Sequence, residues 1–524
     1  MRRTSALLLL FATGLGCGAD SALSIRDPNQ GAPPGPSGPT GNSNVNFGGA
    51  QDFGYFRALV EAGTVPRADD VDAAGFFAEH HTPLPEPSCG QRICLQAMVG
   101  SMGNLITGAE CTLLQLGLNS PVVVDPEQRP PLSLAVVIDV SGSMNQDGKI
   151  AFVRAGLARL IPELKDGDQI ALITYDSRAR VIFPMANVEG NREALLALVR
   201  GLVADGPTNL WGGLELGYQE IEAAYDLARQ NRVILLSDGE PTAGEVNPER
   251  ILELSAAFNT DGIGLTTIGL GADFNLALMR GLAERGDGNF YFLENGAAVE
   301  EVFTEEVAYF TVPLAFELEL TVDAGADFRF VSAFGASTFR PEEDGGTLHL
   351  PSVFLAGRKA HDDVTPNGGR RGGGSALLLE LAASGSSTET PGYSEVAILH
   401  LSYQDGLTRA LHQEVLTVSF PFDTWALDEG GFFDNDIVTK SFVMLNILLG
   451  LQTACDQFHQ GDRDRAVITL RRLAAAVEDY NLEVGDVDIR YDLELIQDLD
   501  AVMIERGATD PENPPIPANP WPRD

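Results

Sequence analysis

The centre of the chain alternates between two patterns of apolar residues. Short runs such as 134–138 and 233–236 contain no polar residue, which is typical of parallel strands buried on both faces. Longer segments between them carry apolar residues at every third or fourth position, as helices that cover a sheet do. The alternation predicts an α/β domain over residues 131–310, with a doubly wound, Rossmann-like parallel sheet between two layers of helices.

The same pattern places the elements of this domain. Strands are predicted at 132–140, 169–175, 233–237, 265–271 and 289–293, with an edge strand at 179–183. Helices are predicted at 149–164, 192–202, 209–228, 248–258, 276–285 and 297–309.

The segments on either side follow other patterns. Residues 312–423 alternate apolar and polar positions, which predicts an antiparallel β-sandwich. Residues 47–128 combine two short helical stretches with strand-like segments, and we interpret them as a small α+β lead-in domain. Residues 436–506 form a helical region, in which Lys440 and Asn446 leave too few consecutive apolar residues for a membrane span.

Length and charge limit the classes of function. A chain of 524 residues can hold about three or four domains. Its 35 Lys and Arg against 74 Asp and Glu give a net charge of −39, and such a surface repels nucleic acid and anionic lipid. The glycine-rich stretch 367–375 lacks the Gly-Lys-Ser/Thr ending of a phosphate loop. We therefore expect no nucleic-acid or nucleotide partner, whereas a bound cation could join two acidic proteins.

Both ends of the chain carry signals of export and disorder. Residues 1–17 have two arginines, an apolar run and a terminal cysteine, as a secretory signal peptide does, and Cys17 is the expected lipidation site. Gly14 stands where bacterial lipoprotein signals have an aliphatic residue, so plain cleavage is the alternative. Residues 18–46 are expected to form a flexible linker and residues 510–524 a disordered tail. This predicts a membrane-anchored lipoprotein of the bacterial cell envelope, which touches the membrane through its lipid alone.

Cysteine spacing predicts one disulfide. In an oxidising compartment Cys89 and Cys94 are close enough in sequence to pair across a four-residue loop. Two free buried thiols are the alternative, and a zinc half-site has less support because no second Cys or His pair follows at metal spacing. His80 and His81 stand alone and are expected to be a surface pair.

Five oxygen-bearing residues follow the predicted strands of the α/β domain. Asp139, Ser141 and Ser143 come directly after one strand, Thr208 lies before a predicted helix, and Asp238 follows another strand. Carboxyl ends of parallel strands meet at one edge of the sheet, where ligands of such folds bind, so these side chains can converge. Oxygen donors suit a hard divalent cation. The alternative is that the serines and the threonine merely cap helices.

The motifs that carry these residues resemble those of the von Willebrand factor type A (vWA) domain. They are Asp-x-Ser-x-Ser at 139–143, Gly-Pro-Thr-Asn-Leu at 206–210 and Ser-Asp-Gly at 237–239. The resemblance implies a metal-ion-dependent adhesion site, in which the hydroxyls and aspartates bind Mg²⁺, with Mn²⁺ or Ca²⁺ as alternatives, and a partner's carboxylate completes the shell. Residues 47–128 are similar, more loosely, to the lead-in domain of one bacterial branch of vWA proteins, through Phe56, 63–66, 76–77 and 83–85.

The leading hypothesis is a binding protein rather than an enzyme. Ser141 lacks the Gly-x-Ser-x-Gly nucleophile elbow, and its motif contains no histidine to act as a base. We expect an exported adhesion module whose cation captures an acidic residue of a partner protein, with Trp211 as a candidate contact on the rim. Packing of Trp211 against the first turn of its own helix is the alternative for that residue. An envelope scaffold with a structural or vestigial metal site is the alternative for the protein.

Overall fold

The computed structural model describes most of the chain between Ser43 and Thr509. The described residues are 43–46, 49–50, 53–108, 110–122, 129–271, 274–286, 288–293, 302–303, 313–336, 338–355, 376–383, 393–421 and 432–509. The expected signal peptide with Cys17, the glycine-rich stretch and the expected tail lie outside these residues. Of the helix expected at 297–309, the structure describes residues 302–303 alone.

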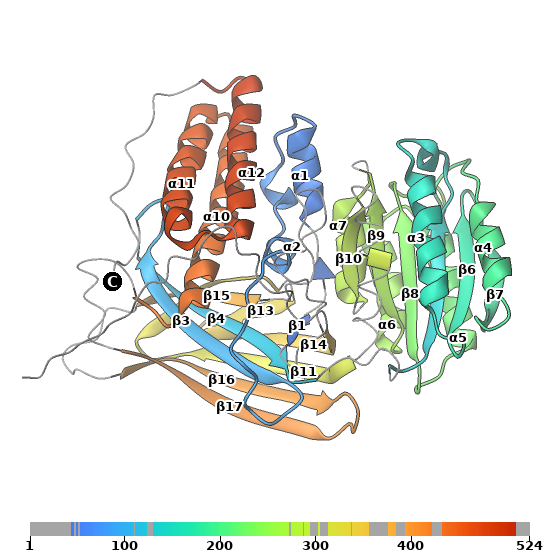
Figure 1. Ribbon diagram of the computed structural model, residues 1–524, viewed down its shortest axis with the longest axis horizontal. Coiled ribbons are helices and arrows are strands. Elements are labelled where there is room, and N and C mark those ends of the chain that lie inside the picture. The colour runs from blue at the N-terminus through green and yellow to red at the C-terminus, as the bar shows by residue number, and fades with distance from the viewer. Residues whose placement is uncertain are drawn as a thin grey trace, which may run out of the picture. The chain divides into compact units, whose positions relative to one another are not determined.

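The sheet of the α/β domain has seven strands in the order β2-β10-β9-β8-β5-β6-β7 (Figure 1). β5 is buried along its whole length and pairs in parallel with β6 on one side and β8 on the other. The chain thus leaves β5 in one direction and returns on the opposite side, which creates a topological switch point at the carboxyl ends of β5 and β8. The strands are β2 (Gly49–Ala50), β5 (Leu132–Asp139), β6 (Gln169–Tyr175), β7 (Ala179–Asn187), β8 (Gln230–Ser237), β9 (Gly264–Leu270) and β10 (Asn289–Leu293).

Helices cover both faces of this sheet because successive residues of β5 point to opposite sides. Val136 and Ile138 pack in one apolar core with residues of α3 and α4. Ala135 and Val137 pack in the other with residues of α5, α6 and α7. The predicted doubly wound α/β fold is confirmed, with β7 as an antiparallel edge strand. The helices are α3 (Lys149–Glu163), α4 (Arg192–Arg200), α5 (Leu210–Ala223), α6 (Pro248–Thr260) and α7 (Leu276–Arg285).

The remaining strands form an antiparallel β-sandwich. Their pairing follows the path β12-β15-β4-β1-β14-β11-β16-β17, with β3, β13 and β18 paired alongside. Apolar residues of β4, such as Leu114 and Leu116, share one core with Leu318 and Leu320 of β11. The strands are β1 (Ser43–Asn46), β3 (Cys94–Gly103), β4 (Glu110–Ser120), β11 (Pro313–Ala324), β12 (Phe328–Phe334), β13 (Phe339–Glu342), β14 (Gly345–Leu355), β15 (Ala376–Ala383), β16 (Tyr393–Asp405), β17 (Leu411–Pro421) and β18 (Phe432–Phe433).

Strand pairing crosses the segment boundaries expected from sequence. β3 and β4 come from the 47–128 segment, yet β4 pairs with β15 from the sandwich segment. The last four residues of the expected flexible linker form β1, which pairs with β4 through Ser43–Asn44 and with β14 through Val45–Asn46. The lead-in and the sandwich therefore share one set of strands.

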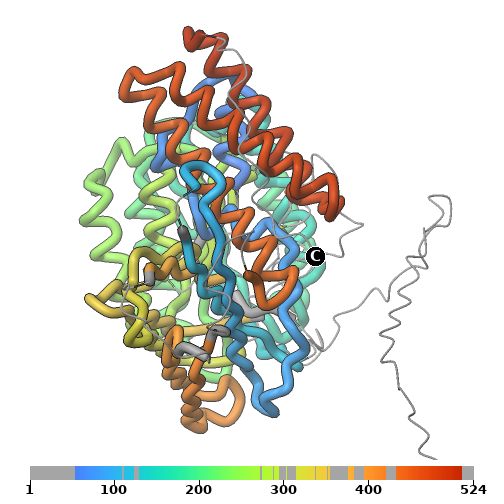
Figure 2. Tube along the Cα trace, turned by 90° about the vertical axis from the view of Figure 1, so that its left-hand side faces the viewer, coloured from blue at the N-terminus to red at the C-terminus, as the bar shows by residue number. Residues whose placement is uncertain are grey.

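Helices from the two ends of the chain pack on the outer face of the sandwich. α10, α11 and α12 lie side by side, as the orange-to-red segments of Figures 1 and 2 show. Leu113 of β4 points toward these helices, whereas the adjacent Leu114 points into the sandwich. The helices are α1 (Gly54–Glu61), α2 (Ala73–Ala78), α10 (Asp436–His459), α11 (Arg463–Val484) and α12 (Val487–Glu505).

α10 corrects the expectation about membrane spans. Its length and mean hydropathy of 1.4 are sufficient for a span, so Lys440 and Asn446 do not lower its apolar content enough to exclude one. However, 72% of that apolar window is buried inside the protein. Asn446 accepts a hydrogen bond from the Leu105 backbone N–H at 2.9 Å. The apolar residues of α10 serve the core of the protein in this structure.

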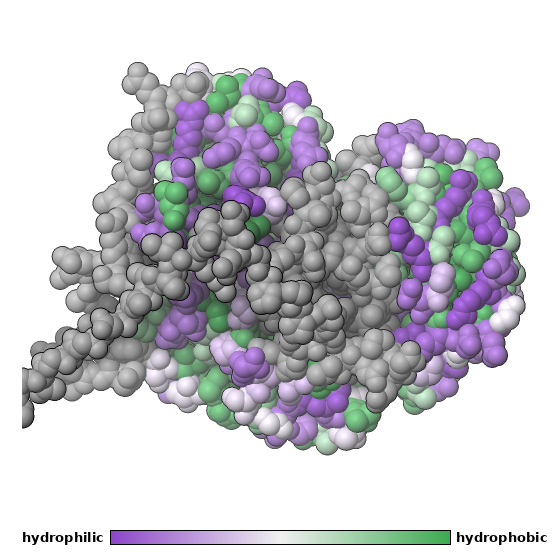
Figure 3. Space-filling model, viewed as in Figure 1, coloured by the Kyte–Doolittle hydropathy of each residue, from purple (hydrophilic) through white to green (hydrophobic). Residues whose placement is uncertain are grey.

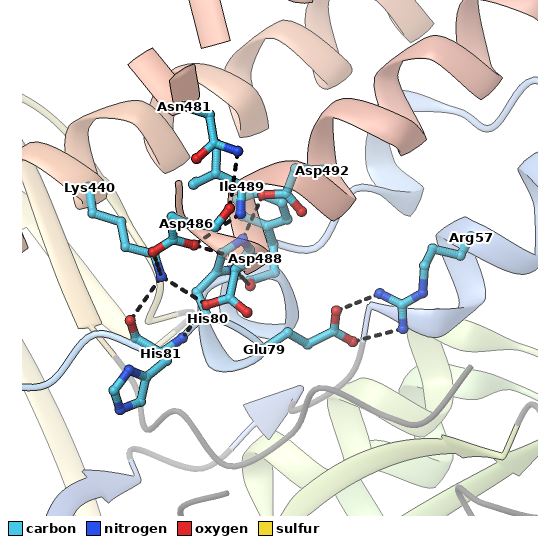
Figure 4. Close-up of polar contacts among 11 residues, drawn as sticks. Arg57, Glu79, His80, His81, Lys440, Asn481, Asp486, Asp488, Ile489 and Asp492 are labelled. Atoms are coloured by element: carbon cyan, nitrogen blue, oxygen red, sulfur yellow. Dashed lines mark hydrogen bonds and ion pairs between the residues drawn. The ribbon is translucent and has the colours of Figure 1, made fainter. Parts of the chain in front are cut away.

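His80 is buried rather than part of a surface pair (Figure 4). Its Nδ1 lies 2.7 Å from the Phe76 carbonyl oxygen and its Nε2 lies 2.6 Å from Asp492. The ammonium of Lys440 lies 2.8 Å from both Asp486 and Asp488. Burial alone would raise the pKa of Asp488, but the charges of His80 and Lys440 hold that pKa well below its usual range. We call His80, Lys440, Asp486, Asp488 and Asp492 the helical charge cluster.

Candidate metal centre

Two aspartates lie together because their strands are neighbours. The register of β5 and β8 pairs Ile138 with Leu236, which sets Asp139 beside Ser237 and places Asp238 one residue further on. Ser237 Oγ donates a hydrogen bond to Asp139 Oδ2 at 3.0 Å. Both aspartates are buried. The switch point of the sheet thus brings together two acids that are ninety-nine positions apart in the sequence.

The loop after β5 joins these aspartates through two serines. The backbone N–H of Ser141 donates to Asp139 Oδ1 at 2.8 Å. Ser141 Oγ lies 3.1 Å from Ser143 Oγ, and Ser143 Oγ donates to Asp238 Oδ1 at 2.8 Å. Four of the five predicted ligands therefore form one continuous chain of hydrogen bonds.

Thr208 supplies the fifth oxygen from the loop before α5. Its backbone N–H donates to Thr242 Oγ1 at 2.9 Å, and Gly142 N–H donates to the Gly206 carbonyl at 2.8 Å, so this loop is fixed against its neighbours. A Cβ placed on Gly239 would lie 3.8 Å from both Ser143 Oγ and Thr208 Oγ1. The two hydroxyls thus face one point, which glycine leaves free of a side chain.

Helix capping does not explain these hydroxyls. No side chain caps α3, whose N-cap is Gly148. The short 3₁₀ turn Gly142–Asn145 has Ser141 at its N-cap without a side-chain capping bond. At α5 the capping side chain is Asn209, which accepts from the Gly212 N–H, rather than Thr208. The alternative raised from sequence is therefore wrong for all three hydroxyl residues.

The electrostatics of the centre favour a bound cation. Burial raises the pKa of Asp139 to about 6, hydrogen bonds from Ser141 and Ser237 oppose this rise, and the charge of Asp238 adds to it. Lys149 Nζ lies 2.9 Å from Asp238 Oδ2, inside the protein. A second cation near Asp139 would offset the cost of keeping that carboxylate charged out of water.

The donor set fits a hard divalent metal. Two carboxylates and three hydroxyls are oxygen ligands of the kind that Mg²⁺ accepts, together with water. In the part of the chain that the structure describes, no group of three or more His, Cys, Asp and Glu is placed to hold a metal. A search for acidic or histidine clusters alone would thus miss a centre in which hydroxyls are the majority.

Sequence reasoning missed two neighbours of the centre. Ser237, in the Ser-Asp-Gly motif, orients Asp139, and its place beside Asp238 was the available signal. Lys149, the first residue of α3, pairs with Asp238. Its signal was a lysine in the first turn of a predicted helix, where the helix dipole disfavours positive charge.

The other predicted residues lie elsewhere. Trp211 is half-buried at the start of α5 and packs against the core that contains Tyr175 and Leu214. Cys89 and Cys94 are joined in a disulfide with their Cα atoms 5.6 Å apart. Cys111 and Cys455 are free and buried.

The surface of the α/β domain carries both hydrophilic and apolar residues (Figure 3). Figure 3 shows hydrophilic residues interspersed with smaller apolar areas on one face of the α/β domain. A cavity of about 720 Å³ lies beside the centre, between α4 and strands β6 and β7, and Val140, Thr174 and Leu198 are among its lining residues. Val203, also in the lining, is 75% exposed.

Comparison with known proteins identifies the α/β domain. Residues 133–305 match the sequence model of the von Willebrand factor type A domain. The chain is 29% identical over 199 residues to the uncharacterized protein YfbK of Escherichia coli (strain K12), which covers 38% of this chain and 34% of that protein. It is 30% identical over 183 residues to inter-alpha-trypsin inhibitor heavy chain H4 of Bos taurus, which covers 33% of this chain and 19% of that protein.

A solved structure extends the likeness beyond this domain. A von Willebrand factor type A protein from Catenulispora acidiphila superposes with a TM-score of 0.52 at 15% sequence identity, over 78% of this chain and 91% of that one. At this identity the likeness concerns the fold alone.

The chain therefore contains a vWA domain. Such domains typically bind a divalent metal at a metal-ion-dependent adhesion site, for which Asp139, Ser141, Ser143, Thr208 and Asp238 are the predicted residues here, and they mediate contacts between proteins. The matched region spans about a third of the length of YfbK and a fifth of the length of the heavy chain.

Proposed function

We propose that this protein binds a partner protein through a divalent cation held by Asp139, Ser141, Ser143, Thr208 and Asp238. The observation that carries the proposal is the convergence of Ser143 Oγ and Thr208 Oγ1 on the space over Gly239. Serine and threonine hydroxyls in a strand-end crevice, bonded to two buried aspartates, form a ligand set for a hard cation. Mg²⁺ is the proposed ion, with Mn²⁺ and Ca²⁺ as alternatives.

The partner is proposed to supply a carboxylate. Three of the five protein ligands are neutral, so the cation keeps much of its positive charge and attracts an anionic side chain. An acidic residue on a partner protein is the ligand of matching chemistry. Because both proteins would then be acidic at the contact, the cation is needed to join them.

Binding rather than catalysis is proposed for Ser141. Its hydroxyl bonds to Ser143, and its backbone bonds to Asp139, whereas a nucleophilic serine needs a general base within hydrogen-bond reach. The same residues are thus better suited to holding a cation than to acyl transfer.

Cation binding is the first property to test. Calorimetric titration of Mg²⁺, Mn²⁺ and Ca²⁺ into the tag-free chain should show one saturable site, lost in Asp139→Ala. Asp261→Asn, which removes a carboxylate at the exposed end of α6, should leave binding intact. A folded wild-type protein that binds none of the three ions would contradict the proposal and favour an envelope scaffold.

Export and lipid anchoring are part of the same proposal. The mass of the mature amino terminus in a bacterial host tests them, since acylation at Cys17 adds the mass of its fatty chains. Cleavage that leaves Cys17 unmodified would remove the anchor from the proposal and leave an exported protein.

A further inference from the structure

Lys149 is an unusual residue to find at a cation site. It is the first residue of α3 and only 3% exposed, and its Nζ lies 2.9 Å from Asp238 Oδ2. A lysine in the first turn of a helix faces the positive end of the helix dipole, and a buried ammonium loses its hydration. Both effects disfavour this position, so the ion pair with Asp238 is what holds the charge there.

The two aspartates of the centre consequently differ. Asp139 is hydrogen-bonded by Ser141 and Ser237 and interacts with the hydroxyl of Tyr175, and all three partners are neutral. Asp238 accepts one hydrogen bond from Ser143 on Oδ1 and an ion pair from Lys149 on Oδ2. Both oxygens of Asp238 are thus engaged, and half of the negative charge of the pair of aspartates is already balanced by the protein.

The end of the lysine side chain lies against Gly271, the residue that follows β9. A Cβ placed on Gly271 would lie 2.5 Å from Lys149 Cε and 3.1 Å from Nζ. Gly271 also has a φ of +74°, a conformation that favours glycine. The close approach of Gly271 therefore contributes to the burial of the ammonium beside Asp238.

We infer that Lys149 is a counter-charge that lowers the affinity of the centre alone for a divalent cation and makes tight binding depend on a carboxylate from a partner. The inference rests on the proposed function of the centre. Two aspartates and one lysine carry a formal charge of −2 + 1 = −1. A divalent cation changes this to +1, and one external carboxylate brings it to zero.

Without Lys149 a different combination of charged groups would be neutral. The two aspartates and a divalent cation would already sum to zero, and an external carboxylate would leave an uncompensated negative charge in a buried site. Neutral combinations are favoured where water is excluded. With Lys149 present, the neutral combination therefore contains both the metal and the partner's carboxylate. Because linkage is reciprocal, each of these two ligands strengthens the binding of the other.

The test compares the Mn²⁺ affinities of the full chain and of Lys149→Met, measured by the electron paramagnetic resonance signal of free Mn²⁺ with and without added acetate. Lys149→Met keeps a similar length and removes the charge, and it should bind Mn²⁺ about tenfold more tightly or better, since one unit charge acts at short range. Acetate should tighten Mn²⁺ binding to the wild type and not to the variant. Lys165→Met, just beyond the other end of α3, removes the same charge away from the centre and should behave as the wild type.

Thermal melting shows whether Lys149→Met is folded. Because Asp238 loses its partner in Lys149→Met, the variant should melt lower without metal, and Mn²⁺ should raise its melting temperature more than that of the wild type. Equal or weaker Mn²⁺ binding by a folded Lys149→Met, with binding by the wild type, would overturn this inference alone. Absence of Mn²⁺ binding in both folded proteins would overturn the proposed metal function together with it.

Discussion

The metal centre and the helical charge cluster are both buried groups of charges. They differ in how far the protein's own side chains supply partners for those charges. In the cluster the ammonium of Lys440 has three acceptors, namely Asp486, Asp488 and the His81 carbonyl. An ammonium has three donors, so its hydrogen-bonding capacity is filled by the protein. In the metal centre Lys149 balances one aspartate, and the hydroxyls of Ser143 and Thr208 face a point without a side chain.

The difference separates a structural network from a binding site. Where each aspartate has a lysine or a histidine as its partner, the network holds elements together, here the end of α2 with α10 and α12. Where one buried carboxylate has neutral partners, an added cation can supply the counter-charge that the protein does not. Burial of charge alone would not distinguish the two.

Lys440→Met should break the structural network with the largest effect. Removing the cation leaves Asp486 and Asp488 without their counter-charge, and breaking a buried ion pair costs about 3–5 kcal/mol of the free energy of unfolding. Urea unfolding would measure this loss. Calorimetry should find the Mn²⁺ affinity of the folded variant unchanged, and a large drop in that affinity would show that the two groups of charges are coupled. The exposed pair of Arg250 and Glu253 offers a control, since Arg250→Met should cost less than about 1 kcal/mol.

Asp139 should make the metal-free protein less stable as pH rises. Burial raises its pKa from 3.8 to about 6, so the stabilising contribution of its protonated form is fully present below about pH 4 and is lost as pH rises through about 6. The shift corresponds to about 2–3 kcal/mol. Urea unfolding in chelator from about pH 3.5 to about pH 7 should show the wild type losing this amount relative to Asp139→Asn. Parallel curves for the two proteins would contradict the raised pKa.

Removal of the disulfide should affect stability alone. The Cys89–Cys94 bridge closes a short loop, so the double change Cys89→Ser and Cys94→Ser should lower the free energy of unfolding by about 2 kcal/mol. Guanidinium unfolding under non-reducing conditions would measure it, with the reduced wild type as the matched control. The cation affinity should not change, because neither cysteine contacts the described residues of the centre.

Trp211→Ala should have the smallest effect on stability. The half-buried indole packs on the core beside α5, and its truncation should cost about 1–2 kcal/mol, less than for a fully buried aromatic residue. Differential scanning calorimetry would measure the loss, and Trp211→Phe should recover part of it. Cation affinity should stay the same. Once a partner is known, weaker partner binding by the folded variant would place Trp211 in the interface, and unchanged binding would exclude it.

Local signals in the sequence were sufficient for the α/β domain and its centre. Asp139 and Asp238 each follow an unbroken apolar run, and parallel strands have their carboxyl ends at one edge, so convergence could be predicted without knowing any contact. Local periodicity and the usual right-handed crossover between parallel strands were sufficient to predict the fold of this domain.

Long-range partners could not be predicted in the same way. The sequence predicts strand-like segments within residues 47–128, but it does not say that β15, more than two hundred residues later, pairs with β4. For the same reason His80 gave no sign of its partner Asp492, which lies 412 positions away. Lys149 was visible as a charge at a helix start, yet only the structure shows that the end of its side chain lies against Gly271.

The short segment from Ser43 to Ala50 has a mechanical consequence. β1 pairs with strands of the sandwich, and β2, two residues later, pairs with β10 of the vWA domain. Tension on the chain before Ser43 would therefore load the sandwich first, through backbone hydrogen bonds of β1, before any pull reached the sheet that carries the metal centre. The hydrogen bonds of β1 to β4 and β14 would thus be the first to bear a load applied from the amino-terminal side.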